Sequence, residues 1–353
     1  MKAALFYGGR DIRVEDHPVP EPGPGEVLVR VRAAGICGSD LHPYLERSPP
    51  AGGAGVATRR GHELAGEVVE LGARVTGLQV GARVGVQPAH LDGCGGCDFC
   101  RSGDTHLCPE RGLRHGERLQ SSGFAEYDIS RAANVRVLPD EVSSEAAAIL
   151  DCYACGVHAL VRARLTPATT VVVLGTGAIG MTAGQVARTS GVGKVIMVGN
   201  RAAPLKTALD AGAADEVVAA EASDPVEAVL DLTGGRGAEV VLEAVGADSS
   251  TLRQGVEMAR PGGEVVVLGI FTGTPDFDVR AAYRKELHIR WSNSYSTWGG
   301  APEFRLALDL LAAGRVDAEA LITHRFSLNR IADAFHAAAD KKGSGAVKVL
   351  VRP

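Results

Sequence analysis

The stretch Val171–Gly180 reads Val-Val-Val-Leu-Gly-Thr-Gly-Ala-Ile-Gly and lies near the middle of the 353-residue chain. Its four leading apolar residues predict a short strand that is buried on both faces. Gly175, Gly177 and Gly180 then form a G-x-G-x-x-G pattern, and Met181–Ala187 follows without a helix breaker. Glycines let the backbone approach a pyrophosphate closely, and the first turn of a helix supplies free N–H groups. The stretch therefore predicts a dinucleotide site. The alternative is a glycine-rich turn that only packs a helix on a strand.

Strands and helices alternate after this stretch, which predicts a doubly wound parallel sheet in an α/β domain. The further strands are expected at Lys194–Val198, Glu216–Val218, Ala238–Leu242, Glu264–Leu268 and Leu287–Trp291. The residues expected to contact the cofactor are Gly175, Thr176, Gly177, Ala178, Ile179, Gly180, Gly199, Asn200, Arg201, Val245, Gly269 and Ile270.

The end of the second strand predicts which dinucleotide is bound. In NAD-binding folds of this kind an acidic residue about 20 residues beyond the glycines accepts hydrogen bonds from the adenosine ribose. Here that place is taken by Gly199, and Asn200 and Arg201 follow it. A guanidinium suits a 2′-phosphate, so the sequence favours NADP(H) over NAD(H). The alternative is that Arg201 only stabilises a loop.

Composition narrows the class of protein. An apolar content of 45% with 45 glycines fits soluble α/β folding, and a net charge of −5 without a basic block argues against nucleic-acid or membrane partners. The N-terminal residues lack the pattern of a signal peptide, so a cytoplasmic location is expected. In that reducing compartment the seven cysteines are expected to be metal ligands or buried thiols.

The N-terminal part gathers polar groups after a region of short strands. Residues 1–36 alternate strands with proline-rich turns and predict antiparallel β structure. Cys37, Ser39 and His42 then place a thiol, a hydroxyl and an imidazole within six positions. Taken alone, Cys37 is more often a buried small residue and His42 a surface or core histidine. The loop Glu46–Arg60 is rich in Pro, Gly and Ala and has no periodic pattern, so it is expected to cover or border a pocket. It leads into Gly-His-Glu at 61–63.

The loop Pro88–Pro109 carries the most specific signal in the chain. Its cysteines are Cys94, Cys97, Cys100 and Cys108. Four thiolates in one short loop fit a closed tetrahedral zinc site, with the metal replacing a hydrophobic core. Two disulfides and an iron–sulfur cluster are the alternatives.

The remaining segments complete the predicted domains. A helix is expected over Ser143–Leu150, capped by Ser143 or Ser144, and Asp151 follows it as a carboxylate in apolar helical sequence. The expected domains are 1–152 with a metal lobe at 88–109, the cofactor domain at 153–294, and a return to the first domain at 295–353.

Over essentially its whole length the sequence resembles the zinc-containing medium-chain alcohol and polyol dehydrogenases. Gly61-His62-Glu63 with Gly66, Gly72 and Val75 is similar to the zinc signature of that family. The four-cysteine loop is similar to its structural-zinc lobe, and the central glycines to its Rossmann cofactor domain. The resemblance implies a mostly β, GroES-like catalytic domain.

The resemblance also implies roles for single residues. Cys37 and His62 match ligands of a catalytic zinc, and Glu63 matches a carboxylate that can ligate the metal or leave it. Asp151 falls where the family places its third protein ligand, with Cys152 as the competing choice. Ser39 resembles the hydroxyl that takes the alcohol proton, and His42 the imidazole that passes it to solvent through the cofactor ribose. Two zinc ions per chain are implied.

The predicted function is hydride transfer between NADP(H) and a secondary alcohol or its ketone, on a polyol, sugar or cyclitol. Alternatives are a simple secondary-alcohol dehydrogenase, a threonine-type amino-alcohol dehydrogenase, a zinc-free reductase of the same fold and a non-enzymatic NADPH-binding protein. The expected partners are a small-molecule substrate and further copies of the chain, in a homodimer or homotetramer.

Overall fold

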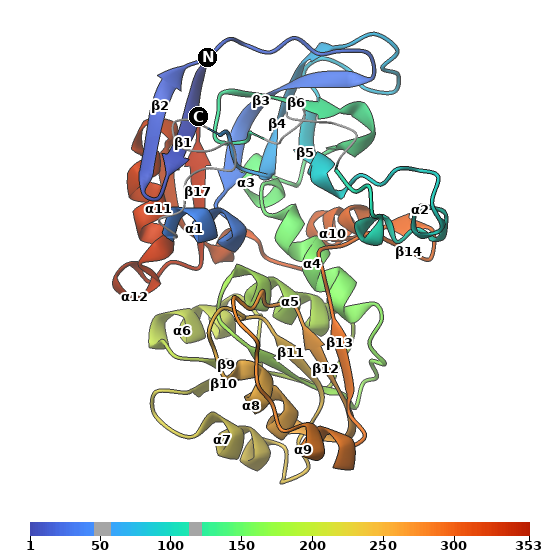
Figure 1. Ribbon diagram of the computed structural model, residues 1–353, viewed down its shortest axis with the longest axis vertical. Helices are drawn as coiled ribbons and strands as arrows, with labels where there is room; N and C mark the ends of the chain where they lie inside the picture. The colour runs from blue at the N-terminus through green and yellow to red at the C-terminus, as the bar shows by residue number, and fades with distance from the viewer. Residues whose placement is uncertain (46–57, 113–121) are drawn as a thin grey trace. The chain divides into compact units, whose positions relative to one another are not determined.

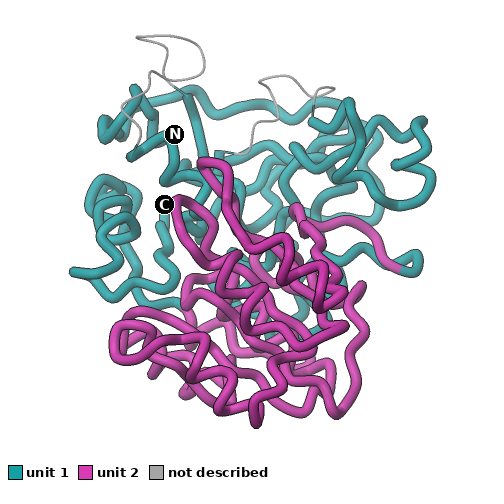
Figure 2. Tube along the Cα trace, turned by 60° about the horizontal axis from the view of Figure 1, so that its bottom comes forward, with its two compact units in different colours: residues 1–151, 299–312, 322–353 teal, residues 152–298, 313–321 magenta. Residues whose placement is uncertain are grey.

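The computed structural model describes residues 1–45, 58–112 and 122–353, and most of the loop Glu46–Arg60 therefore lies outside the described residues. The chain divides into two compact units, coloured teal and magenta in Figure 2. The first unit contains Met1–Asp151, Gly299–Ala312 and Ile322–Pro353. The second contains Cys152–Trp298 and Ala313–Leu321.

The second unit is built on a six-stranded sheet in which every described pairing is parallel. Its order is β10-β9-β8-β11-β12-β13, with bounds β8 Thr170–Leu174, β9 Lys194–Gly199, β10 Glu216–Ala219, β11 Ala238–Glu243, β12 Ala259–Val267 and β13 His288–Trp291 (Figure 1). This is the order of a doubly wound dinucleotide-binding fold, and it confirms the predicted fold class. The order reverses between β8 and β11, where such folds bind their ligands.

Helices cover this sheet and bury its strands. Those that pack on its strands are α5 Ala178–Thr189, α6 Ala202–Asp210, α7 Pro225–Leu232 and α8 Thr251–Met258. The unit also contains α9 Val279–Arg284 and most of α4 Leu150–Leu160, which begins in the first unit. Val172 and Leu174 share a hydrophobic core with residues of α7 and α8. Val171 and Val173, which alternate with them along β8, are also fully buried. The four apolar residues before the glycines are thus covered on both faces, as a parallel strand requires.

The first unit holds the predicted antiparallel β structure. β1 Lys2–Gly8 pairs with β2 Asp11–Asp16, and a seven-stranded sheet follows the order β16-β17-β3-β4-β5-β7 with β6 beside β3. The bounds are β3 Glu26–Gly35, β4 Glu63–Leu71, β5 Arg83–Val86, β6 Tyr127–Arg131, β7 Val135–Val137, β16 Ile322–Ser327 and β17 Lys348–Arg352. The C-terminal strands therefore complete a sheet that the N-terminal strands begin.

The core of this sheet is capped by aromatic residues and helices. Phe335 of α11 (Ile331–Ala339) lies 5.1 Å from Phe6 and 5.5 Å from Phe124, measured between ring centroids. The other helices of the unit are α1 Gly38–Leu45, α2 Asp98–Ser102, α3 Ser144–Ala147, α10 Glu303–Ala312 and α12 Lys341–Ser344, and α11 packs against β16, β17 and β2. Among the helices in the described ranges, none combines the length and the apolar character that crossing a membrane requires.

One helix differs from the sequence prediction in a way that affects the site. The expected helix over Ser143–Leu150 is split, because Ile149 closes a tight turn on the carbonyl of Ala146 and α4 begins only at Leu150. Ser143 caps the shorter helix α3 through its hydroxyl, which accepts from the N–H of Ala146. Asp151 consequently lies in the first turn of α4, where free N–H groups favour a carboxylate.

Candidate active site and structural metal site

The predicted catalytic ligands Cys37, His62 and Glu63 lie together in the first unit. One ligand atom from each of the three is within 4.8 Å of the others. Cys37 follows β3, and His62 and Glu63 stand at the start of β4. The antiparallel pairing of Gly35 with Glu63 brings these two chain positions side by side.

Two glycines make this approach sterically allowed. Gly61 has a φ of 98°, and a Cβ there would come within 2.9 Å of the backbone nitrogen of Phe124. At Gly35, a Cβ would lie 2.1 Å from Oε2 of Glu63. Larger residues at either position would therefore displace the ligands, which explains the glycines on local grounds.

Asp40 is a buried carboxylate that supports both Cys37 and His62, and the sequence analysis did not assign it a role. Its Oδ2 accepts from the N–H of Cys37 at 3.0 Å, as the third residue of a helix reaches back in a capping box. Its Oδ1 is 3.9 Å from Nδ1 of His62. A carboxylate on that side of the ring favours the tautomer whose other nitrogen faces a metal. The sequence feature that could have indicated this role is the position of Asp40, three residues after Cys37.

Asp151 faces the other side of the same imidazole. Its Oδ2 lies 4.0 Å from Nε2 of His62. Cys152, one residue further, is 1% exposed and belongs to the second unit. Burial alone would lower the pKa of His62, but the Cys37 thiol and the carboxylates of Asp40 and Asp151 raise it well above its ordinary value. The acidic groups around the His62 imidazole therefore create an environment that stabilises a positive charge.

Lys348 is the second residue that sequence reasoning missed. It lies on β17, is 2% exposed and pairs with the fully buried carboxylate of Glu63. Its ammonium group also donates to the carbonyl of Ile36 at 3.1 Å. Glu63 is therefore held by a cation that would compete with a metal for the same carboxylate.

The proposed proton-relay residues lie on α1. Ser39 is exposed in the first turn, and His42 is half-buried one turn later. A third histidine, His90, packs edge-to-face on His62 with ring centroids 5.6 Å apart. It comes from the 3₁₀ turn Ala89–Leu91, which leads into the four-cysteine loop.

The four cysteines Cys94, Cys97, Cys100 and Cys108 form a second group whose sulfur atoms all lie within 4.8 Å of one another. The sulfur atoms of Cys97 and Cys100 are 3.5 Å apart. Two ligand atoms bound tetrahedrally to one zinc, with bonds of about 2.0–2.3 Å, would be roughly 3.3–3.8 Å apart. The four thiols and the spacing of this sulfur pair therefore fit zinc.

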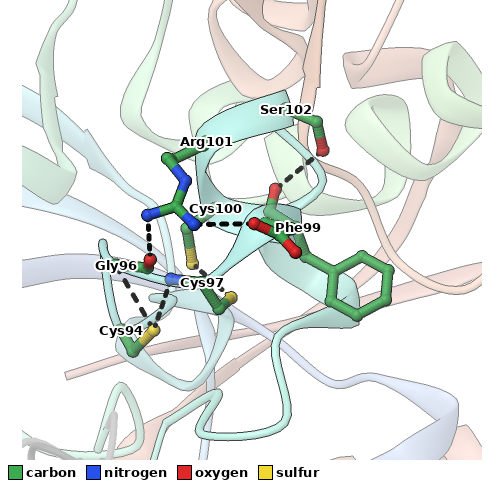
Figure 3. Close-up of polar contacts among 8 residues, drawn as sticks. Cys94, Gly96, Cys97, Phe99, Cys100, Arg101 and Ser102 are labelled. Carbon is green, nitrogen blue, oxygen red and sulfur yellow. Dashed lines mark hydrogen bonds and ion pairs between the residues drawn. The ribbon is translucent and has the colours of Figure 1, made fainter.

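Backbone donors prepare this loop for a metal. The N–H groups of Gly96 and Cys97 donate to the sulfur of Cys94 and lower its pKa to about 7. Burial instead raises the pKa of Cys100 to about 12. Arg101 of α2 stabilises the turn, because it donates to the carbonyl of Gly96 at 2.5 Å (Figure 3). It also donates to the carboxylate of Asp98. A metal would replace the protons of the remaining thiols.

The glycine pattern has the geometry that its spacing predicts. Gly175 has a φ of 111°, and a Cβ on Gly180 would come within 2.0 Å of the carbonyl oxygen of Gly175. A Cβ on Gly177, the residue before α5, would meet no atom within 4 Å. The first and third glycines thus serve the turn and the packing of helix on strand. The second leaves open space at the helix N-terminus, where a pyrophosphate is bound in this fold.

The end of β9 carries the residues expected to choose between cofactors. β9 ends at Gly199, Asn200 is exposed, and Arg201 is half-buried before α6. Burial lowers the pKa of Arg201. A Cβ on Gly199 would lie 2.4 Å from the methyl carbon of Thr176, so the glycine is also needed for packing.

Two family models match the chain and cover most of it. Residues 23–140 match the alcohol dehydrogenase GroES-like domain, and residues 178–313 match the zinc-binding dehydrogenase domain. The chain belongs to the zinc-dependent medium-chain alcohol and polyol dehydrogenase family, and it is an NAD(P)-dependent alcohol dehydrogenase.

Known relatives align along the full chain. A sorbitol dehydrogenase of Halalkalibacterium halodurans is 36% identical, covering 100% of this chain and 99% of the relative. D-xylulose reductase A of Aspergillus oryzae is 32% identical, with 98% and 95% covered. A solved structure from Sinorhizobium meliloti, bound to NADP, is 31% identical with a TM-score of 0.87 and covers 100% and 99%.

Proposed function

We propose that the enzyme transfers hydride between NADP(H) and a secondary hydroxyl of a polyol, sugar or cyclitol. The observation that carries the proposal is the convergence of Cys37, His62 and Glu63, with Asp151 beside the imidazole. The names of two relatives, a sorbitol dehydrogenase and a D-xylulose reductase, support polyhydroxylated substrates. A simple secondary alcohol and an amino alcohol are the alternative substrates.

In this proposal Cys37, His62 and Asp151 would hold one zinc ion, and Glu63 would be a further ligand that the substrate can displace. When bound, zinc would polarise the substrate hydroxyl and the nicotinamide would accept the hydride. Ser39 accepts the hydroxyl proton at its Oγ while its own hydroxyl proton passes on toward His42, which releases a proton to solvent. Asp40 orients the His62 ring, and Lys348 holds the carboxylate of Glu63.

The test of this function is a panel of substrates followed by nicotinamide absorbance. The panel contains polyols, simple secondary alcohols and amino alcohols, each with NADP⁺ and with NAD⁺. Turnover is expected with polyols and NADP⁺. If the enzyme prefers simple secondary alcohols, these become the proposed substrates in place of polyols. Absence of turnover with every compound of the panel would favour a non-enzymatic role.

Two zinc ions per chain are expected, because the two ligand sets share no residue. Replacing Asp151 by Ala should reduce the zinc content from two to one and abolish most turnover, since only the four-cysteine site keeps its ligands. Elemental analysis of the zinc-loaded protein measures both numbers. Full zinc content and activity in D151A, together with loss in C152A, would assign the third ligand to Cys152 instead.

Arg201→Ala is expected to weaken NADP⁺ binding about ten- to a hundredfold and to leave NAD⁺ binding nearly unchanged. A charge-assisted contact to a 2′-phosphate is worth roughly 1.5–3 kcal/mol, and NAD⁺ lacks that phosphate. Cofactor titration measures both affinities. Arg188→Ala is the control, because Arg188 pairs with Asp215 in the same unit. Equal weakening of both cofactors, or a wild-type preference for NAD⁺, would contradict the assignment.

A carboxylate at this place should weaken the preference for NADP⁺. Asp at position 199 would press its Cβ on Thr176, so the cleaner variant is Asn200→Asp, which adds a charge to an exposed side chain. This variant should bind NADP⁺ less well than wild type because the carboxylate repels the phosphate.

We also propose that the enzyme acts as a cytoplasmic homodimer or homotetramer. β13 is the edge strand of its sheet, and Trp291 on it is 60% exposed. Light scattering of the purified chain would show a monomer if this proposal is wrong.

A further inference from the structure

Glu243 is a buried carboxylate at the place where the sheet order reverses. It is the last residue of β11, is 0% exposed, and pairs in register with Leu174, the last residue before the glycine loop. A Cβ on Gly175 would come within 2.8 Å of a methyl carbon of Val245. The residues after Glu243 therefore lie directly against the predicted cofactor loop.

One oxygen of Glu243 shapes the turn that follows. Oε1 accepts from the N–H groups of Val245 and Gly246, both at 2.9 Å, and from the hydroxyl of Thr251 at 2.7 Å. Three donors on one carboxylate oxygen bend the chain back toward α8. The turn is thus set by this side chain as well as by its own backbone bonds.

The main chain of Glu243 holds a second loop, the one that follows β12. Its carbonyl accepts from the N–H groups of Leu268 at 2.8 Å and Gly269 at 3.1 Å. The two loops are also joined directly, because the N–H of Ala247 donates to the carbonyl of Ile270 at 2.7 Å. One residue therefore fixes both loops on which Val245 and Ile270 lie.

The second carboxylate oxygen of Glu243 is costly to bury. Oε2 has no hydrogen-bond donor among residues 1–45, 58–112 and 122–353. It lies where a Cβ on Gly269 would come within 2.4 Å. A buried acceptor without a donor lowers stability, so this oxygen offsets part of what the three hydrogen bonds to Oε1 contribute. Sequences keep such unfavourable choices mainly at functional sites.

The two loops carry the exposed side chains of Val245 and Ile270. Both are apolar and yet exposed, at 43% and 64%. They stand at the carboxyl ends of β11 and β12, the edge at which this fold binds dinucleotides. We propose that Glu243 is a positioning residue for the nicotinamide half of the cofactor, acting through these two loops. This inference rests on the proposed cofactor site.

The test compares a whole cofactor with one that lacks nicotinamide. For Glu243→Ala we expect hydride transfer to fall by up to about 10²-fold, because small displacements of reacting groups have effects of that size. NADPH should bind more weakly, by fluorescence titration, while 2′-phospho-ADP-ribose binds as to wild type, by calorimetry. NADH and ADP-ribose are measured in parallel, so the test does not depend on cofactor preference.

Companion variants keep the inference falsifiable if Glu243→Ala folds poorly. Glu243→Gln retains an acceptor oxygen and should restore nicotinamide binding, whereas Thr251→Val and Gly269→Ala should show a milder form of the selective loss. Glu239→Ala is the control, since Glu239 lies on the same strand and accepts from the N–H of Thr170 at 2.8 Å. It should lower Tm without changing the ratio of the two affinities.

The outcomes separate this inference from the proposed function. Equal loss of both ligands, or unchanged binding of both, in Glu243→Ala and Gly269→Ala would overturn the positioning role. A wild-type chain that binds neither NADPH nor NADH nor the two ribose fragments would overturn the cofactor site itself.

Discussion

Replacing Ser39 by Ala should lower kcat about 10²–10⁴-fold, the usual range for a side chain that transfers a proton in the transition state. Ser39 is exposed in the first turn of α1, two residues after Cys37 and three before His42. Its removal should leave the metal ligands and the cofactor loop untouched, since they lie on other elements. The loss should therefore fall on kcat, with little change in zinc content or in the dissociation constant of NADPH.

Two control variants are compared with Ser39→Ala in the kcat measurement. Ser39→Thr keeps the hydroxyl and should retain most of the turnover. Ser102→Ala removes an exposed hydroxyl on α2 and should change nothing in catalysis. Unchanged turnover in Ser39→Ala would remove Ser39 from the relay. Loss of zinc in that variant would show that the hydroxyl serves the metal site instead.

The sequence predicted the cofactor sheet well because its signals are local. Each buried strand is a short apolar run in the sequence. The turn after β8 is predicted by its glycines, Gly175, Gly177 and Gly180. The four-cysteine group was equally readable, since all its donors lie in one loop. Such features depend on neighbours along the chain.

Contacts between segments that are far apart in the chain could not be predicted from the sequence in this way. Lys348 approaches Glu63 only because β17 joins β3 at the middle of the sheet, and a single lysine in a C-terminal strand gives no sign of this. The segment Ala313–Leu321 packs with the second unit through Asp317, whose backbone exchanges hydrogen bonds with the side chain of Gln185. Asp40 was overlooked for a different reason, because an acidic residue early in a helix has an ordinary structural role.

Lys348→Met should destabilise the metal-free chain by about 3–5 kcal/mol, the usual effect of leaving one member of a buried ion pair uncompensated. Glu63 is 1% exposed, and the ammonium group of Lys348 is its charged partner in the described structure. Met fills a similar volume, so the loss should come from the charge and not from a cavity. Chemical unfolding of the chain in a chelator measures the change.

Zinc should offset part of this loss, because Glu63 lies within reach of the same group as Cys37 and His62. A carboxylate released by Lys348 can pair with a cation at that group. Zinc should therefore raise the unfolding midpoint of Lys348→Met by more than it raises that of wild type. An equal increase in both proteins would show that Glu63 does not move between its two partners.

A double-mutant comparison tests whether the pair acts as a unit. Glu63→Gln alone leaves a buried ammonium group and should also be strongly destabilising, whereas E63Q/K348M removes both charges and should be more stable than either single variant. Lys194→Met is the matched control, because Lys194 pairs with Glu216 at the surface with side chains 35% and 37% exposed. That change should cost no more than about 1 kcal/mol. If Lys348→Met is as mild as Lys194→Met, or if the double variant is less stable than both singles, the buried pair does not control Glu63.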